Sequence, residues 1–252
     1  MWGWPVPGEL RATTLGRVGY LAGWRLQEAV ATRVAAGGPE RLLLLEHDPV
    51  YTIGRRGTLA HLTAAPEDLR SAGASVYRVD RGGDITYHGP GQLLGYPILS
   101  LGDAPDVVAY VRALEDALRA TLADFGIASR SIEGRTGVWV TLPDRRDAKI
   151  AAIGVRVSRG VTRHGFALNV DTDLAAFDRM IPCGFMHEVG SFARLGVRAT
   201  VADVTRVCAE RLAERLGRAL HWDDAIASPR EDEIPADAPV RGAEDLLAPV
   251  AA

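Results

Sequence analysis

Cysteine, lysine and long apolar runs are all scarce in this sequence. Its 252 residues include two cysteines, too few for a disulfide framework, so we expect a reducing, cytoplasmic location. The continuous apolar runs are short, as at residues 42–45, and none approaches the roughly 20 residues that cross a membrane. The N-terminus also lacks the basic-then-apolar layout of a signal peptide.

Neither the net charge nor the sequence motifs indicate a nucleic-acid or nucleotide ligand. The 29 Lys+Arg and 32 Asp+Glu residues give a net charge of −3, without the basic excess expected of a nucleic-acid-binding protein. Neither a Walker A loop nor a GxGxxG dinucleotide fingerprint occurs. The histidines and cysteines lack the paired spacing of a zinc site. We therefore expect neither a nucleotide cofactor nor a metal.

Lysine is represented once. One of the 29 basic residues is Lys149, and the other 28 are arginine. Arginine stays charged in proteins, whereas lysine can lose its proton and act as a compact amine. A lone surface lysine would need no explanation, but its neighbourhood in the chain makes Lys149 a candidate for proton transfer.

Apolar patterning predicts an α+β fold with a mixed or antiparallel sheet. Strands are expected at 41–47, 50–57, 74–79, 93–101, 137–142, 150–157 and 161–170, and helices at about 21–34, 65–73, 103–124 and 200–216. Pro97 marks the 93–101 strand as an edge or interrupted strand, and residues 158–160 read as a short hairpin loop. Residues 1–224 are expected to form one catalytic domain. Residues 225–252, rich in Pro, Ala, Asp and Glu, are expected to form a largely disordered tail.

The segment 81–92, RGGDITYHGPGQ, combines four glycines with many polar side chains. Glycines allow the backbone to approach a ligand closely. A plain turn does not require this density of functional groups, so the composition favours a ligand-binding loop. Taken singly, His88 is more often structural than catalytic.

The two cysteines stand in different contexts. Cys208 falls on the apolar stripe of the 200–216 helix, where a buried inert thiol is expected. Cys183 lies between Pro182 and Gly184, residues that favour a tight turn. A nucleophilic thiol needs a neighbouring cation or base. Lys149 is the first candidate, and a papain-like histidine, His187 or His88, is the alternative.

Four stretches resemble one family closely. They are EHDPVYTIGRRG (46–57), RGGDITYHGPGQLLGYPIL (81–99), KIAAIGVRVSRGVTRHGFALNV (149–170) and IPCGF (181–185). Together they are similar to the octanoyl-[acyl-carrier-protein]–protein N-octanoyltransferases, the lipoate-protein ligase B family. The resemblance covers about residues 10–220 without departure at the motif positions, although Asp84 stands where the family tolerates several residue types.

The resemblance implies a fold, a catalytic pair and a substrate site. The fold would be that of the biotin and lipoate protein ligases: a mixed sheet, a smaller second sheet and flanking helices. Cys183 would be the acyl-thioester nucleophile, and Lys149 would lower its pKa. The acyl chain would contact Arg81, Gly82, Gly83, Asp84, Ile85, Thr86, Tyr87, His88, Ala152, Ile153, Gly154, Gly165, Phe166 and Ala167.

The implied reaction is octanoyl transfer from acyl carrier protein, through the cysteine thioester, to a lysine ε-amine of a lipoyl domain. The acceptors would be the lipoyl domains of 2-oxoacid dehydrogenase complexes and the glycine cleavage H protein. Since a thioester is already activated, neither ATP nor a metal is expected. We further expect a monomer that binds neither nucleic acid nor membrane.

Three alternatives remain open. An ATP-dependent lipoate-protein ligase would form an acyl-adenylate and need no cysteine. A non-catalytic acyl- or lipoyl-binding module would keep the Gly-rich loop but would have no use for Cys183 and Lys149 together. A thioester hydrolase would share the acyl-enzyme and differ only in its acceptor.

Overall fold

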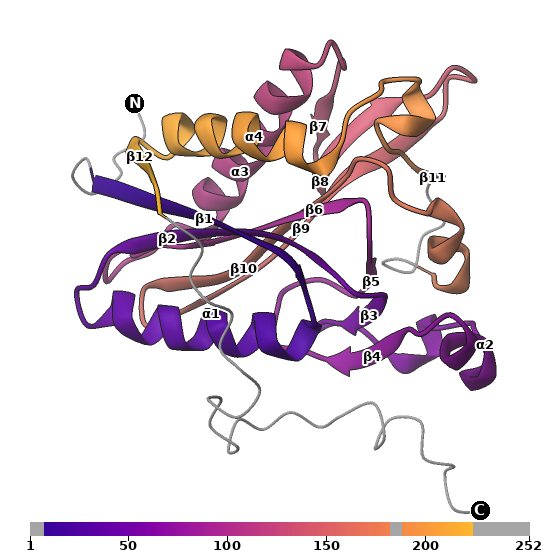
Figure 1. Ribbon diagram of the computed structural model, residues 1–252, viewed down its shortest axis with the longest axis horizontal. Coiled ribbons are helices and arrows are strands. Elements are labelled where there is room, and N and C mark those ends of the chain that lie inside the picture. The colour runs from indigo at the N-terminus through magenta and orange to yellow at the C-terminus, as the bar shows by residue number, and fades with distance from the viewer. Residues whose placement is uncertain (1–7, 182–187, 224–252) are drawn as a thin grey trace, which may run out of the picture.

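Two β-sheets of unequal size organise the chain (Figure 1). The computed structural model describes residues 8–181 and 188–223; the predicted tail at 225–252 lies outside them. The large sheet contains β1 (Gly8–Val18), β2 (Glu40–His47), β6 (Gln92–Ile98), β7 (Arg130–Ile132), β8 (Arg135–Thr141), β9 (Asp147–Ser158), β10 (Val161–Asn169), β11 (Glu188–Val189) and β12 (Arg218–Trp222). The small sheet contains β3 (Val50–Ile53), β4 (Ser75–Arg78) and β5 (Ile85–His88).

Strand order confirms the α+β class and its mixed sheet. The large sheet runs β12-β1-β2-β6-β10-β9-β8-β7, with β11 beside β9. Pairing is parallel between β1 and β2, β1 and β12, and β9 and β11, and antiparallel elsewhere in that sheet. The small sheet, in the order β4-β3-β5, is mixed as well. The smaller second sheet that the resemblance implied is therefore present.

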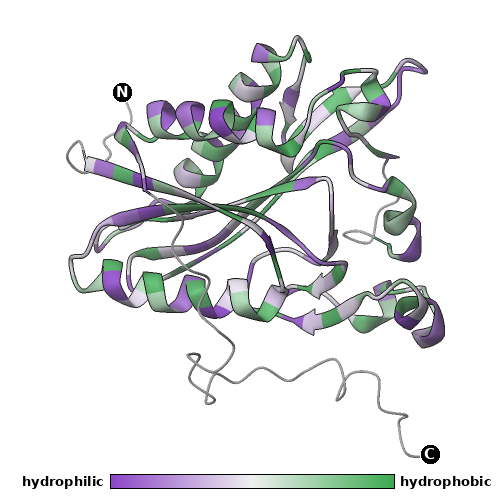
Figure 2. Cartoon of the chain, in the orientation of Figure 1, coloured by the Kyte–Doolittle hydropathy of each residue, from purple (hydrophilic) through white to green (hydrophobic). Residues whose placement is uncertain are grey.

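Helices cover both faces of the large sheet because their apolar stripes need a partner surface. The helices are α1 (Tyr20–Ala35), α2 (Pro66–Ser71), α3 (Val107–Asp124) and α4 (Val201–Arg215), with short 3-10 turns η1 (Leu59–His61), η2 (Leu174–Arg179) and η4 (Ala193–Leu195). One apolar core lies under α3 and α4, and a second lies under α1. The small sheet has a core of its own with α2 and η2. Figure 2 shows hydrophobic and hydrophilic residues alternating around the turns of these helices.

The helix ends follow the capping residues. Asp106 accepts a hydrogen bond from the backbone N–H of Ala109 at 2.8 Å, so α3 begins after Pro105 rather than at Asp103. Thr200 and Asp203 form a reciprocal capping box at the start of α4. Within the described residues, none of the helices has the length and apolar character required to cross a bilayer.

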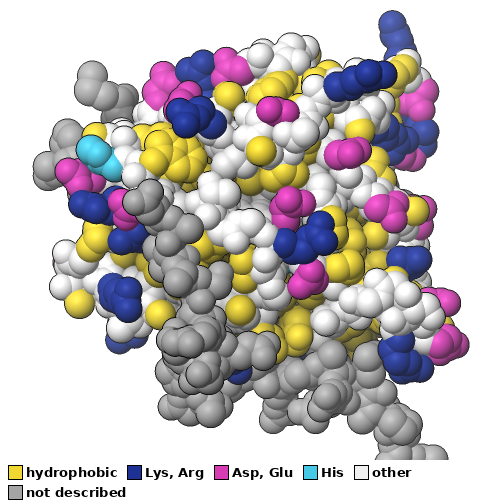
Figure 3. Space-filling view, viewed as in Figure 1, with side chains coloured by type: hydrophobic (Ala, Val, Ile, Leu, Met, Phe, Trp, Pro, Cys, Tyr) yellow, Lys and Arg dark blue, Asp and Glu magenta, His cyan; other side chains and the backbone are white. Residues whose placement is uncertain are grey.

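The molecular face seen in Figure 3 carries basic and acidic side chains interspersed, without a patch of one sign. Ion pairs link α3 to α4, where Arg211 donates to Asp124 at 2.7 Å and Arg215 pairs with Asp116. Both of these arginines are therefore matched locally by carboxylates. The mixture of charges agrees with the small net charge.

Some elements differ from the prediction. The sequence did not reveal β1, β7, β11 or β12, and β5 lies within the segment interpreted only as a loop. In β1 a register shift between Thr14 and Arg17 breaks the period-two pattern, which removes the signal that identifies a strand. The predicted 50–57 strand ends at Ile53, because a turn follows in which Gly57 donates to the carbonyl of Gly54.

The assignment of 93–101 to an edge was wrong: β6 lies inside the sheet between β2 and β10. Pro97 is accommodated because the β6–β10 pairing stops at Gly95. Opposite Pro97 in register stands His164, whose φ of +56° turns its backbone away. The Thr162 hydroxyl donates to the carbonyl of Pro97 at 2.7 Å. The interruption predicted from Pro97 therefore exists on one side of a central strand.

Candidate functional site

Arg81 fastens the Gly-rich loop to the small sheet. Its buried guanidinium donates to the carbonyl of Thr52 at 2.6 Å and to the Thr52 hydroxyl at 2.9 Å. The next residue, Gly82, donates its N–H to the carbonyl of Val155 on β9 at 2.9 Å. A Cβ on Gly154 would lie 2.9 Å from the Gly82 carbonyl oxygen, so only glycine allows this approach. The loop and Gly154, predicted to share a site, are thus in contact.

Asp84 is held by protein partners. One carboxylate oxygen accepts from the backbone N–H of Ile85 at 2.8 Å, and the other lies 2.6 Å from Nδ1 of His61. Gly83 has a φ of +89°, which favours glycine, and its carbonyl accepts from the N–H of Arg56. Gly83 and Asp84 therefore fix the loop against the 54–57 turn and η1.

Strand β5 divides the remaining loop residues between two faces, because successive strand side chains alternate. Ile85 and Tyr87 pack into the small core with α2 and η2. Thr86 and His88 therefore point the other way, towards the large sheet. The side chains of Ile85 and Tyr87 do not share a surface with those of Thr86 and His88.

His88 begins a buried chain of hydrogen bonds. Its Nδ1 lies 2.8 Å from Oε1 of Gln92, and Nε2 of Gln92 donates to Asn169 at 2.8 Å. Asn169 donates in turn to the carbonyl of Gly190 at 3.0 Å, and the N–H of Gly190 donates to the carbonyl of Lys149 at 3.0 Å. The chain therefore connects the Gly-rich segment to the strand that carries Lys149.

Burial keeps the His88 imidazole neutral. Desolvation is the main cause that lowers its pKa to about 3, and the nearby His47 lowers it further. Because the Gln92 amide oxygen accepts from Nδ1, the Nε2 atom carries the lone pair. The ring also stacks on Tyr20, with centroids 6.3 Å apart. His88 is thus an oriented, uncharged group.

Small residues on β9 and β10 share one face of the large sheet, where Ala152 and Gly154 are partly exposed and Gly165 and Ala167 are buried. Gly154 stands directly opposite Gly165, and Ala152 opposite Ala167, so all four point to the same face. We call these four residues the small-residue patch. Ile153 and Phe166 point to the other face, where they pack into the core under α3 and α4.

A β-bulge brings Lys149 onto the face of the small-residue patch. In a regular strand Lys149 and Ala152 would point to opposite faces. The β8–β9 register shifts between Val138 and Trp139, and the consecutive residues Ile150 and Ala151 both enter the same core. After this shift Lys149 and the patch share a face, about 10 Å apart along the strand by the usual rise per residue.

The aromatic ring of Trp139 lies beside Lys149. Trp139 stands opposite Lys149 across the β8–β9 ladder, and the Lys149 Nζ atom is 4.8 Å from the ring centroid. Sequence reasoning overlooked Trp139 and Gly137. A glycine and a tryptophan inside one apolar strand, TGVWV, were the available signal.

Cys183 and the alternative base His187 lie outside the described residues. The described residues on either side of them are held in place. Ile181 donates its N–H to the carbonyl of His61 at 2.8 Å, and Val189 pairs in parallel with Lys149. Cys208, in contrast, is fully buried, and burial raises the pKa of its thiol to about 12. This confirms the interpretation of Cys208 as an inert core residue.

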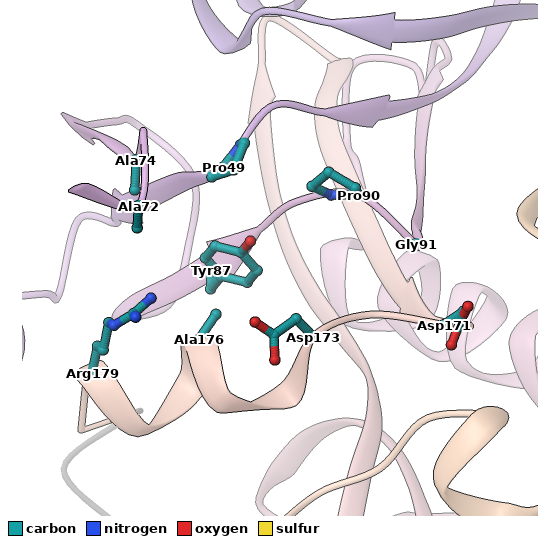
Figure 4. A pocket seen from close by; sticks show the side chains of 10 residues that line it. All are labelled: Pro49, Ala72, Ala74, Tyr87, Pro90, Gly91, Asp171, Asp173, Ala176 and Arg179. Atoms are coloured by element: carbon teal, nitrogen blue, oxygen red, sulfur yellow. The ribbon is translucent and has the colours of Figure 1, made fainter. Parts of the chain in front are cut away.

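A pocket of about 600 Å³ opens between the small sheet and η2 (Figure 4). Its lining residues are Pro49, Ala72, Ala74, Tyr87, Pro90, Gly91, Asp171, Asp173, Ala176 and Arg179. Of the predicted substrate residues it contains only Tyr87, whose pKa burial raises to about 12. Lys149 and the small-residue patch do not line this pocket.

Comparison with known proteins found a matching family model and similar curated proteins. The model of the lipoyl protein ligase A/B catalytic domain matches residues 19–213. An octanoyltransferase of Solibacter usitatus is 52% identical over 192 residues, covering 75% of this chain and 85% of the relative. An octanoyltransferase of Mycolicibacterium smegmatis is 48% identical over 217 residues, covering 85% and 90%.

Solved structures show the same fold at low sequence identity. A bi-partite lipoate protein ligase from Thermoplasma acidophilum has a TM-score of 0.66 at 18% identity, covering 88% of each chain. A lipoate-protein ligase A bound with ATP has a TM-score of 0.70 at 19% identity, covering 88% of this chain and 91% of its own. The arrangement of the two sheets is therefore shared with these ligases.

Proposed function

The chain belongs to the lipoyl protein ligase A/B catalytic family and is an octanoyltransferase that acts in protein lipoylation, and from this premise we propose that the octanoyl group passes through a thioester on Cys183. The Cys183 thiolate attacks the carbonyl of an octanoyl thioester on acyl carrier protein. The carrier's thiol leaves with one proton, and an octanoyl-enzyme remains.

The second half of the reaction consumes this thioester. The neutral ε-amine of a lipoyl-domain lysine attacks the carbonyl, the C–S bond breaks, and an amide forms. One proton is transferred to the departing Cys183 thiolate. Lys149 carries a proton in each half: first from Cys183 to the departing carrier thiolate, and then from the attacking amine to the departing Cys183 thiolate.

The observation that supports this proposal is the shared face of Lys149 and the small-residue patch. Ala152 and Gly154 are partly exposed and offer an acyl chain a surface without large side chains, whereas Gly165 and Ala167 are buried. The loop at Arg81 and Gly82 touches the same surface. Lys149 lies at one end of this surface. It pairs with Val189 of β11, which follows Cys183 by six residues in the sequence.

The proposed cofactors and partners follow from the use of a thioester as the acyl donor. The thioester already supplies the free energy for amide formation, so the reaction uses neither ATP nor a metal. Acyl carrier protein is the donor, and the acceptors are the lipoyl domains of 2-oxoacid dehydrogenase complexes and the glycine cleavage H protein. The protein works as a monomer in the cytoplasm, where its thiols stay reduced.

Intact mass spectrometry after mixing with octanoyl-acyl carrier protein tests the proposal. The wild type and Cys208→Ser should each gain one octanoyl group, and Cys183→Ala should gain none. Adding a lipoyl domain, with chelator present and nucleotide absent, should move the group to the acceptor. An adduct that persists in Cys183→Ala would overturn the assignment, and dependence on ATP with free octanoate would favour the ligase alternative.

A further inference from the structure

We propose that Trp139 is the residue that positions Lys149 and stabilises the ammonium that forms when Lys149 takes the proton of Cys183. This inference rests on the proposed role of Lys149 and concerns a residue for which the sequence suggested no function. The Trp139 ring is only 1% exposed. Its Nε1 donates to the carbonyl of Arg135 at 3.1 Å, which fixes the ring in place, and the half-buried Lys149 places Nζ 4.8 Å from the ring centroid.

Gly137 determines the path of the Lys149 side chain. Its φ is +119°, and a Cβ there would lie 2.6 Å from the carbonyl oxygen of Ala151. The same Cβ would lie 3.4 Å from both Cδ and Cε of Lys149, so the lysine stem passes beside this glycine. The N–H of Gly137 donates to the buried carboxylate of Glu115 at 2.9 Å. Glu115 therefore fixes the backbone that the lysine crosses.

Gly137 and Trp139 thus confine the distal half of the Lys149 side chain. The bare backbone at Gly137 leaves room for the stem, and the indole face attracts the charged tip. The negative face of an aromatic ring stabilises an ammonium and gives little to a neutral amine, most strongly for tryptophan and where water is excluded. In the mechanism proposed above, this ammonium favours the Cys183 thiolate.

Charged residues also lie on β8, β9 and β11, the strands around Lys149. Arg135, on the same strand as Trp139, places its guanidinium 5.7 Å from the ring centroid. Asp147, at the start of β9, pairs with Arg130. Glu188, on β11, pairs with Arg146 and Arg194. Both carboxylates are paired with arginines.

The test measures the pH at which Cys183 becomes reactive. Alkylation by iodoacetamide is followed by mass spectrometry from pH 5 to 10 in a Cys208→Ser background, so that one thiol is titrated. Two substitutions are compared, Trp139→Phe and Trp139→Leu. The alkylation midpoint should rise by about 0.5 to 1.5 pH units in Trp139→Leu and by less in Trp139→Phe, which retains a weaker ring. The octanoylation rate should fall in the same order.

Fluorinated tryptophan separates electrostatics from packing. Fluorine withdraws electron density from the ring face and scarcely changes its size, so folding is preserved even if Trp139→Leu unfolds. Protein grown with monofluorinated tryptophan should show a raised midpoint, and difluorinated tryptophan should raise it further. The matched control is Trp139→Phe grown in the same media, in which the remaining tryptophans are fluorinated and the midpoint should not move with fluorine.

The outcomes distinguish this inference from the proposed function. Midpoints that agree within about 0.2 pH units between wild type, Trp139→Leu and the fluorinated proteins would overturn the role of Trp139, even if thermal stability falls. A wild-type protein that never acquires an octanoyl group on Cys183 would instead overturn the proposed function.

Discussion

Acid should destabilise this protein through histidines that are buried in the neutral form. His47 is fully buried, with Nδ1 2.6 Å from the carbonyl of Val18 and Nε2 2.8 Å from the Tyr96 hydroxyl. Burial lowers its pKa to about 4. Burial, with the added effect of His47, lowers the pKa of His88 to about 3. Burial also lowers the pKa of His164.

The direction in which stability changes with pH follows from proton binding by the folded and unfolded states. The unfolded chain protonates His47 and His88 near pH 6.5, whereas the folded protein protonates them only near pH 4 and pH 3. The stability they contribute is complete above pH 6.5 and is lost as pH falls towards the folded pKa values. Each group loses about 1.4 kcal/mol per pH unit in that window. At pH 5, His47 and His88 together cost about 4 kcal/mol, a large share of the 5–15 kcal/mol by which domains are usually stable.

Urea denaturation at pH 7, 6 and 5 measures this loss. The wild type should lose at least about 4 kcal/mol of unfolding free energy between pH 7 and 5, and His47→Gln should lose about 2 kcal/mol less over the same interval. His221→Gln is the matched control, because the His221 side chain is 52% exposed. An unchanged pH slope in His47→Gln, whatever its stability at pH 7, would refute the reasoning.

Three further predictions concern the thiols, the lysine and the tail. Cys208 should resist alkylation of the folded protein at pH 8, because burial raises the pKa of its thiol to about 12 and the side chain is fully buried beside Thr121; peptide mapping that finds it modified would contradict this. Lys149→Arg should reduce octanoyl transfer about 10²–10⁴-fold, nearly as much as Lys149→Ala, since arginine cannot donate and regain a proton; turnover of the Arg variant at the wild-type rate would leave Lys149 an electrostatic role alone. Deleting the chain from about Pro229 should leave activity and melting temperature nearly unchanged, because that composition does not build a packed core; a drop in melting temperature would show that the tail docks.

The helices were predictable because their signals are local. Periodic apolar residues and polar caps identify α3 and α4, and Asp106 and Thr200 perform the capping that their residue types favour. The hairpin at residues 158–160 was confirmed, since Arg159 and Gly160 both adopt positive φ and connect β9 to β10.

Features that depend on distant partners could not be predicted. β6 lies inside the sheet with Pro97 opposite His164, a residue far along the chain whose φ is positive. The common face of Lys149 and the small-residue patch depends on a bulge that the spacing of the residues conceals. The motifs identified residues of the candidate site, but which of them share a surface is set by strand register.

The pairing of β12 with β1 has a consequence for the synthesis of the protein. Gly8 stands beside Arg218, some 210 positions later in the chain, and Arg218 also donates to Glu40 on β2 at 2.6 Å. While the ribosome is still translating the intervening residues, the outer edge of β1 has no neighbour, and such an edge readily recruits strands from other chains. The nascent protein therefore depends on protection of its first strand until residues 218–222 emerge, and premature termination before them should yield insoluble product.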